Sequence, residues 1–210
     1  ARMRGLLGLA PDRPVTAFLP GSRPHEVATL LPVMIQTMTS LKSLYPEQQF
    51  VVPRAPNLDE SAFAGAGFPP ECRLVRSHAI EALAASHFAD IASGTSTLQA
   101  TLLKVPMVVV YKLSPLSYFI GKRIIKVKYV SLANLLMERS LGAAQGPFVG
   151  ELLQQEVTVG NVMTELRRVI DAPGYRRALV IRLEEVGRLF HGKCPTERVA
   201  DMVQEIASPL

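Results

Sequence analysis

Hydrophobic residues follow two different spacings along this chain. A short apolar run at Val15–Leu19 precedes a long segment, from Pro24 to about Tyr45, in which apolar residues recur every three or four positions. The first pattern is typical of a buried strand and the second of an amphipathic helix. Proline suits the first turn of a helix, because the N–H that it lacks would have no acceptor within the helix there.

Strand and helix patterns then alternate as far as residue 132. We expect strands at Gln49–Pro53, Cys72–Val75, Ala89–Ser93 and Pro106–Tyr111, and helices at Asn57–Phe63, Ile80–His87 and Thr97–Leu103. A basic helix follows before the run 129–132, and residues 137–150 are expected to be a flexible surface loop because of their glycines and proline. After Val157 the pattern predicts three helices, the last two behind Pro173 and Pro195.

Repeated strand–helix units of this length favour an α/β fold with a Rossmann-like parallel sheet, covered by helices on both faces and followed by C-terminal helices. With 210 residues, 48% of them hydrophobic, the chain is long enough to bury one full core. No apolar run reaches the roughly 20 residues of a membrane span.

Charge and cysteine content narrow the possible partners. The net charge of +5 suits a phosphate-bearing ligand or an anionic membrane surface. The chain has no Trp and no basic patch interleaved with aromatic residues, so we expect no nucleic-acid partner. Cys72 and Cys194 lack the spacing of zinc ligands, so neither a metal site nor a disulfide framework is predicted, and a reducing cytoplasm is expected.

Two predicted turns carry groups that suit an anion. Gly21, Ser22 and Arg23 lie between the first strand and the first long helix, where backbone N–H groups favour a phosphate and an arginine can contact it. Ser93-Gly94-Thr95 stands in the same position after a later strand. Ligands bind beyond the carboxyl ends of parallel strands, so both turns could hold one ligand. The alternative is an ordinary turn with a solvated arginine, together with simple helix caps.

Three stretches resemble the C-terminal half of the lipid-A-disaccharide synthase family: "LPGSRPHEV", "ASGTSTLQATLLKVPMVVVYKLSPLSYFIGKRIIKVKYVSLANLL" and "GELLQQEVT". The resemblance implies half of a GT-B glycosyltransferase that binds UDP-2,3-diacylglucosamine. The whole enzyme would transfer diacylglucosamine to diacylglucosamine 1-phosphate and release UDP, in an inverting, metal-independent reaction of lipid A biosynthesis without a cofactor.

The resemblance also assigns residues to the donor site and divides the chain. Residues 1–14 would join a missing N-terminal half, which would hold the acceptor and the catalytic acid/base, so that this chain alone would be inactive. Residues 15–157 would bind the nucleotide sugar, and residues 158–210 would pack on them or cross back to the partner domain. The implied donor and UDP contacts are Gly21, Ser22, Arg23, Ser93, Gly94, Thr95, Gln99, Asn134, Glu151 and Gln154.

The chain departs from the family pattern at three places. Gln99 stands where the family usually carries a glutamate, and an amide accepts hydrogen bonds from two ribose hydroxyls less well than a carboxylate. Ala133 replaces a typical proline before Asn134, and the segment 137–150 is longer than usual.

The segment 111–130 bears on location. It mixes apolar residues with cations that could face an anionic membrane: Lys112, Lys122, Arg123, Lys126 and Lys128. With the acylated substrates that the family implies, this favours a cytoplasmic protein in peripheral contact with the inner membrane; a partly buried helix with a solvated cationic edge is the alternative. Two other functions stay open. One is a different UDP-sugar protein of this fold, such as a MurG-like transferase or a UDP-GlcNAc 2-epimerase, and the other is a non-catalytic nucleotide- or membrane-binding module.

Overall fold

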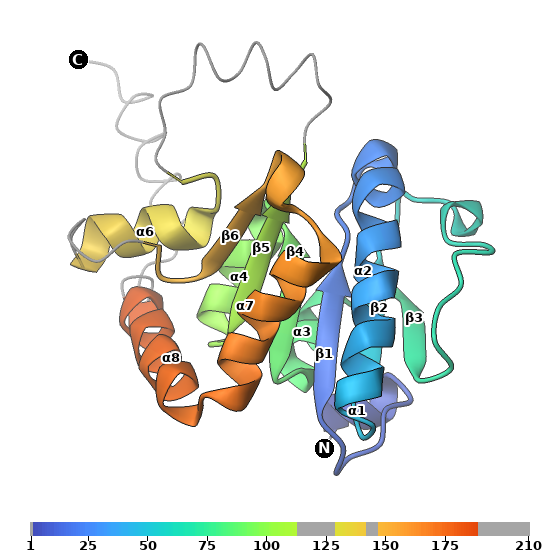
Figure 1. Cartoon of the computed structure of the whole chain (residues 1–210), viewed down its shortest axis with the longest axis horizontal. Helices are drawn as coiled ribbons and strands as arrows, with labels where there is room; N and C mark the ends of the chain where they lie inside the picture. The colour runs from blue at the N-terminus through green and yellow to red at the C-terminus, as the bar shows by residue number, and fades with distance from the viewer. Residues whose placement is uncertain (1, 113–128, 142–146, 189–210) are drawn as a thin grey trace, which may run out of the picture.

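A computed structural model of the chain describes residues 2–112, 129–141 and 147–188. Within these residues, six strands form one parallel sheet in the order β3-β2-β1-β4-β5-β6, and helices lie on both of its faces (Figure 1). This confirms the predicted α/β class and the Rossmann-like parallel sheet.

The strands are β1 (Val15–Leu19), β2 (Gln49–Arg54), β3 (Cys72–Arg76), β4 (Phe88–Ala92), β5 (Met107–Tyr111) and β6 (Gly150–Leu153). The helices are α1 (Arg2–Leu6), α2 (Pro24–Leu44), α3 (Ala79–Ala85), α4 (Thr95–Leu102), α6 (Leu132–Leu141), α7 (Val159–Asp171) and α8 (Pro173–Arg188). Two 3₁₀ turns, η1 (Glu60–Ala62) and η3 (Gln154–Glu156), follow β2 and β6.

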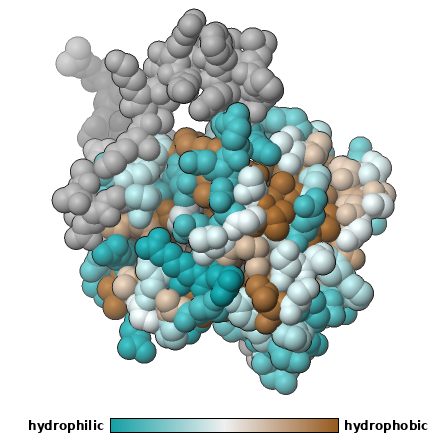
Figure 2. Space-filling view, viewed as in Figure 1, coloured by the Kyte–Doolittle hydropathy of each residue, from teal (hydrophilic) through white to brown (hydrophobic). Residues whose placement is uncertain are grey.

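The sheet separates two hydrophobic layers, because successive side chains of a strand point to opposite faces. Phe18 of β1 packs with α2 and α7 on one face, whereas Ala17 and Leu19 pack with α3, α4, α6 and α8 on the other. Figure 1 shows α2 and α7 in front of the sheet. On that side of the molecule, hydrophobic residues lie in separate small groups among hydrophilic ones (Figure 2). The apolar stripes of these two helices are therefore turned inward.

Several element boundaries differ from the sequence prediction. The helix expected at Asn57–Phe63 is only the 3₁₀ turn η1, and the helix expected at Ile80–His87 ends at Ala85. The segment 137–150, expected to be a loop, continues α6 as far as Leu141 and starts the unpredicted strand β6. That strand forms by pairing with β5, with Val108 opposite Gly150, and a partner distant in sequence leaves no periodic signal in four residues.

The N-terminal residues belong to the folded unit that the structure describes. Leu7 and Leu9 are buried in the layer beneath α3. The side chain of Gln49 also accepts a hydrogen bond from the Ala10 N–H (2.8 Å) and donates one to the Ala10 carbonyl (3.2 Å). Residues 113–128, where most of the expected basic helix falls, and the helix expected behind Pro195 lie outside the described residues. No helix in the described ranges has the length and apolar character needed to cross a bilayer.

One buried side chain in the sheet has no polar partner. Asp90 lies in the middle of β4, paired in register with Phe18 of β1 and Val108 of β5. It is completely buried, and within the described part of the chain neither of its carboxylate oxygens has a hydrogen-bond partner. Burial raises the pKa of Asp90 to about 8, because a charged carboxylate is poorly solvated among apolar groups. Asp90 is therefore protonated in the folded protein at neutral pH.

This burial predicts an unusual dependence of stability on pH. The pKa of Asp90 is raised from 3.8 in the unfolded chain to about 8 in the fold. Its contribution to the free energy of unfolding is therefore fully present below pH 4 and is lost as the pH rises toward 8. Across that window the loss is roughly 1 kcal/mol per pH unit. Asp90→Asn removes the titrating group, so we expect the variant to lose less unfolding free energy than the wild type between pH 5 and pH 8, measured by urea denaturation. Equal slopes for the two proteins would contradict the prediction.

Candidate functional site

A polar cavity lies where the order of the strands reverses. From β1 the chain continues outward through β2 and β3, whereas β4, β5 and β6 lie on the other side of β1. Parallel sheets bind ligands at the carboxyl ends of the strands that flank such a reversal. A cavity of about 430 Å³ opens at this point, at the ends of β1, β2 and β4.

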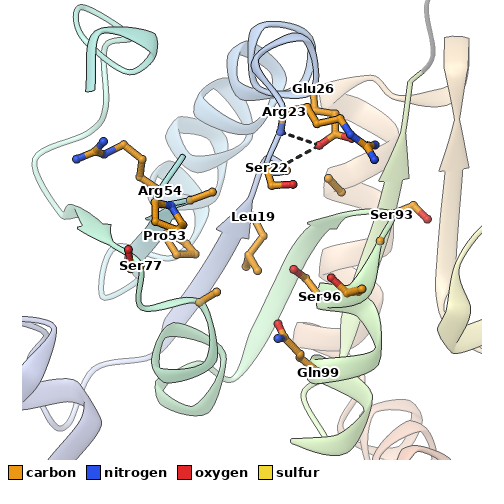
Figure 3. A pocket seen from close by; sticks show the side chains of 17 residues that line it. Leu19, Ser22, Arg23, Glu26, Pro53, Arg54, Ser77, Ser93, Ser96 and Gln99 are labelled. Atoms are coloured by element: carbon orange, nitrogen blue, oxygen red, sulfur yellow. Dashed lines mark hydrogen bonds and ion pairs between the residues drawn. The ribbon is translucent and has the colours of Figure 1, made fainter. Parts of the chain in front are cut away.

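The cavity brings together two turns that are far apart in the sequence. The first turn contributes Gly21, Ser22 and Arg23, and the second contributes Ser93, Gly94 and Thr95. Gln99, one turn further along α4, also lines the cavity (Figure 3). These are the residues that the sequence assigned to one shared site by their place at strand ends and by family resemblance.

The first turn already holds an anion, which is the carboxylate of Glu26. The N–H groups of Ser22 and Arg23 donate to Glu26 Oε2 at 3.0 and 3.2 Å, and Arg23 Nη1 donates to Glu26 Oε1 at 3.0 Å (Figure 3). Glu26 is 8% exposed, whereas the side chain of Arg23 is 70% exposed. The N–H groups of Ser22 and Arg23 are therefore satisfied within the protein, and the guanidinium remains accessible.

Glu26 also explains why the first turn needs a glycine. Gly21 has a φ of +109°, a conformation that residues with a side chain rarely adopt. A Cβ at this position would lie 2.3 Å from Glu26 Oε2. The geometry of the turn therefore requires Gly21 whether or not a ligand is bound.

The second turn is different, because no acidic residue lies in the first turn of α4. The helix begins at Thr95, two residues earlier than the sequence predicted, so Thr95 and Ser96 carry N–H groups that precede the first intrahelical hydrogen bonds. The Thr97 hydroxyl donates to the Gly94 carbonyl at 2.7 Å. The start of α4 can therefore offer backbone N–H groups to an anion in the cavity.

Sequence reasoning missed four polar residues of the cavity wall: Glu26, Arg54, Ser77 and Ser96. Arg54 is the last residue of β2 and Ser77 follows β3, so the rule that selected the other strand ends could have found them. The Arg54 guanidinium donates to the Leu58 carbonyl and lies 3.6 Å from the Glu60 carboxylate, and in Figure 3 it points away from Arg23 and Ser93. The sequence did not predict that Glu26 caps α2, because the usual capping pattern has a serine or threonine three residues before the glutamate, where this chain has Arg23.

Three residues assigned by resemblance do not line this cavity. Asn134 is fully buried: its Oδ1 accepts from the N–H groups of Phe148 and Val149, both at 3.0 Å, and its Nδ2 donates to Glu151 Oε2 at 2.8 Å. Both ends of the Asn134 amide therefore bind groups of the protein, and a contact between Asn134 and the donor stays a prediction. Gln154 is 9% exposed at the end of β6.

Glu151 connects this buried group to the cavity. Its carboxylate accepts from the N–H groups of Val130 and Ser131, and the Val130 carbonyl accepts from the Ser93 hydroxyl at 3.1 Å. Asn134 and Glu151 thus hold the backbone at Val130, which in turn binds Ser93 of the second turn.

The remaining predicted cations lie mostly outside the described residues. Lys112 is partly buried just after β5, and Lys122, Arg123, Lys126 and Lys128 lie in the range that the structure does not describe. In the described residues there is no group of three or more His, Cys, Asp or Glu side chains that could hold a metal ion.

The fold and the position of the cavity define the class of protein. The chain has the architecture of one half of a GT-B protein. CalG4, the calicheamicin glycosyltransferase, matches it with a TM-score of 0.57 at 18% identity, over 95% of this chain and 46% of CalG4. UDP-GlcNAc 2-epimerase from Neisseria meningitidis, solved bound to UDP-GlcNAc, matches with a TM-score of 0.62 at 12% identity, over 97% and 48% of the two chains. At these identities the likeness shows the fold alone.

The chain belongs to the lipid-A-disaccharide synthase family, because the family model described as Lipid-A-disaccharide synthetase matches residues 1–171. The lipid-A-disaccharide synthase of Anaeromyxobacter dehalogenans strain 2CP-1 is 41% identical over 186 residues, 87% of this chain and 47% of the relative. The enzyme of Myxococcus xanthus strain DK1622 is 40% identical over 211 residues, 98% of this chain and 52% of the relative. The chain thus spans about half the length of these curated relatives.

The contact between Gly21 and Glu26 predicts a large difference between two glycines of the cavity. Gly21→Ala should lower the free energy of unfolding by about 2 kcal/mol, because the new methyl group meets a buried carboxylate in a strained conformation. Gly94→Ala is the matched control, since its Cβ has no atom within 4 Å and its φ of 163° is extended. Urea denaturation of both variants measures the difference, and equal losses would contradict the proposed clash.

Proposed function

We propose that this chain is the donor-binding half of a lipid-A-disaccharide synthase. It binds UDP-2,3-diacylglucosamine, and the complete enzyme transfers diacylglucosamine to diacylglucosamine 1-phosphate with release of UDP. The observation that carries this proposal is the shared cavity of the first and second turns at the reversal point of the sheet. Family membership supports the reaction, and the fold supports a nucleotide sugar as the ligand.

The two turns make different contributions to binding the diphosphate. Because Glu26 accepts the N–H groups of Ser22 and Arg23, the first turn contributes the Arg23 guanidinium, which can form two parallel hydrogen bonds to phosphate oxygens. The start of α4 contributes N–H groups and the hydroxyls of Thr95 and Ser96. Gln99 lies one turn deeper along α4, where its amide meets the ribose hydroxyls.

Arg23 also assists the chemical step. Negative charge develops on the departing UDP as the glycosidic bond breaks, and a fixed guanidinium next to the diphosphate stabilises that charge. A cation from the protein in this position suits an inverting transfer that proceeds without a divalent metal. The acceptor and the acid/base residue come from the other half of the enzyme, so this chain by itself does not catalyse transfer.

Asn134 and Glu151 have supporting roles in this proposal. Asn134 and Glu151 fix the backbone around Val130, and Val130 in turn accepts the hydrogen bond from Ser93. The acylated donor favours a location at the cytoplasmic face of the inner membrane, and the basic sequence around Lys112 and residues 122–128 suits contact with anionic lipid headgroups.

Binding of UDP tests the proposal directly. Isothermal titration calorimetry should show that the chain prefers UDP and UDP-2,3-diacylglucosamine to GDP and to UDP-GlcNAc without acyl chains. Arg23→Ala should weaken UDP binding at least about tenfold, because a charge-assisted contact to phosphate is worth roughly 1.5–3 kcal/mol. Arg177→Ala is the control, because Arg177 is an exposed arginine of α8 that does not line the cavity.

Each outcome of the calorimetry has a distinct meaning. An unchanged UDP dissociation constant in Arg23→Ala would remove Arg23 from the phosphate contact. A preference for UDP-GlcNAc over the acylated donor would favour an epimerase or a MurG-like transferase. Absence of any preference among nucleotides would contradict donor binding altogether.

The amide at position 99 predicts a gain-of-function variant. Gln99→Glu introduces a carboxylate that accepts hydrogen bonds from both ribose hydroxyls, so UDP binding should tighten about three- to tenfold. Deoxy-UDP, which lacks the 2′-hydroxyl, should show a smaller gain when the same titrations are repeated. If Gln99→Glu binds UDP no better than the wild type, the ribose contact of this residue is wrong.

A further inference from the structure

The Glu26 carboxylate divides its two oxygens between two tasks. Oε2 accepts both backbone N–H groups of the turn, from Ser22 and Arg23. Oε1 accepts only from the Arg23 guanidinium. Oε2 alone accepts the N–H groups of Ser22 and Arg23. Helix capping therefore does not explain the contact between Oε1 and the Arg23 guanidinium.

The contact of Oε1 restricts a side chain that is otherwise largely solvated. Arg23 is 70% exposed on its side chain, and a solvated arginine samples many rotamers, which it must give up when it binds a ligand. Glu26 lies beneath it, with only 10% of its own side chain exposed, on a helix that is fixed by its apolar face. A single hydrogen bond to Nη1 leaves the other guanidinium donors for an anion. Figure 3 shows the pair at the rim of the cavity, across from Ser93.

We propose that Glu26 is a positioning residue for the diphosphate of the donor, acting through Arg23. Its carboxylate holds the guanidinium at the mouth of the cavity before the nucleotide arrives, so that less conformational freedom is lost on binding. The inference rests on the proposed function, because it assumes that Arg23 binds the diphosphate.

Glu26→Gln separates the two tasks of the side chain. An amide has one acceptor oxygen, and that oxygen can still accept from the N–H groups of Ser22 and Arg23. The amide nitrogen then faces the guanidinium, where it cannot accept a hydrogen bond. The variant therefore keeps the turn and releases Arg23.

A double-mutant cycle measures whether Glu26 acts through Arg23. The four proteins are the wild type, Glu26→Gln, Arg23→Ala and the double variant, each titrated with UDP by calorimetry. When Arg23 is present, we expect Glu26→Gln to weaken UDP binding about three- to tenfold. In the Arg23→Ala background, we expect Glu26→Gln to have no further effect on UDP binding. Glu184→Gln is the matched control, because Glu184 pairs with Lys104 at 2.8 Å and neither residue lines the cavity.

A shorter acid provides a second variant that keeps the charge. Glu26→Asp lacks one methylene group and cannot reach both the turn and Arg23, so it should weaken binding as Glu26→Gln does. Tighter UDP binding in Glu26→Gln would overturn the proposal, since it would mean that the carboxylate competes with the diphosphate. So would an equal loss in the presence and absence of Arg23, or loss of the folded circular dichroism spectrum in both variants, because Glu26 would then be purely structural.

Pyrophosphate, titrated into the same four proteins, keeps the two proposals distinguishable. If the wild type binds pyrophosphate but shows no preference for UDP, the nucleotide assignment fails and the cycle is evaluated with pyrophosphate. If the wild type binds UDP and Glu26→Gln binds it equally well, only the role of Glu26 fails. If the wild type binds neither ligand, both proposals are wrong.

Discussion

The parallel pairing of β1 with β4 is the constraint on which the site depends. Leu19 at the end of β1 lies in register with Ile91 of β4, so both strands end at the same edge of the sheet. Each then enters a turn and a helix, and the starts of α2 and α4 are held on either side of one cavity. A different neighbour for β4 would separate Arg23 from Ser93, and no local feature of either turn would compensate for that separation.

The two helix starts at this cavity look alike in sequence but differ in their electrostatics. Both have glycine and hydroxyl residues in the turn. At α2, a buried carboxylate accepts the backbone N–H groups and pairs with Arg23, whereas the first turn of α4 has no acidic residue. Within the described residues, the start of α4 can therefore offer backbone N–H groups to an anion, and the start of α2 can offer an accessible guanidinium.

Polar residues near the cavity also shape it without lining it. Asn134 is completely buried and uses both ends of its amide to hold backbone, and Glu151 links it to the loop that accepts the Ser93 hydroxyl. Family resemblance assigned both Asn134 and Glu151 to the ligand. Their hydrogen bonds hold the backbone next to the second turn, because a buried polar group must find partners within the protein.

Residues near one another in the chain determined the strands β1, β2 and β5, the long helix α2 and the presence of two anion-compatible turns, since apolar spacing and turn chemistry are local properties. Family resemblance extended this to the ligand that we propose. Only the tertiary structure decided that β6 is a strand, that Asn134 and Asp90 are buried, and that Glu26 occupies the donors of the first turn. The pairing of β6 and the burial of Asn134 and Asp90 depend on which distant segments pack against these residues, and that depends on the arrangement of the whole sheet and its helices. The contacts of Glu26 are local, but the usual capping pattern did not predict them, because Arg23 stands where that pattern has a serine or threonine.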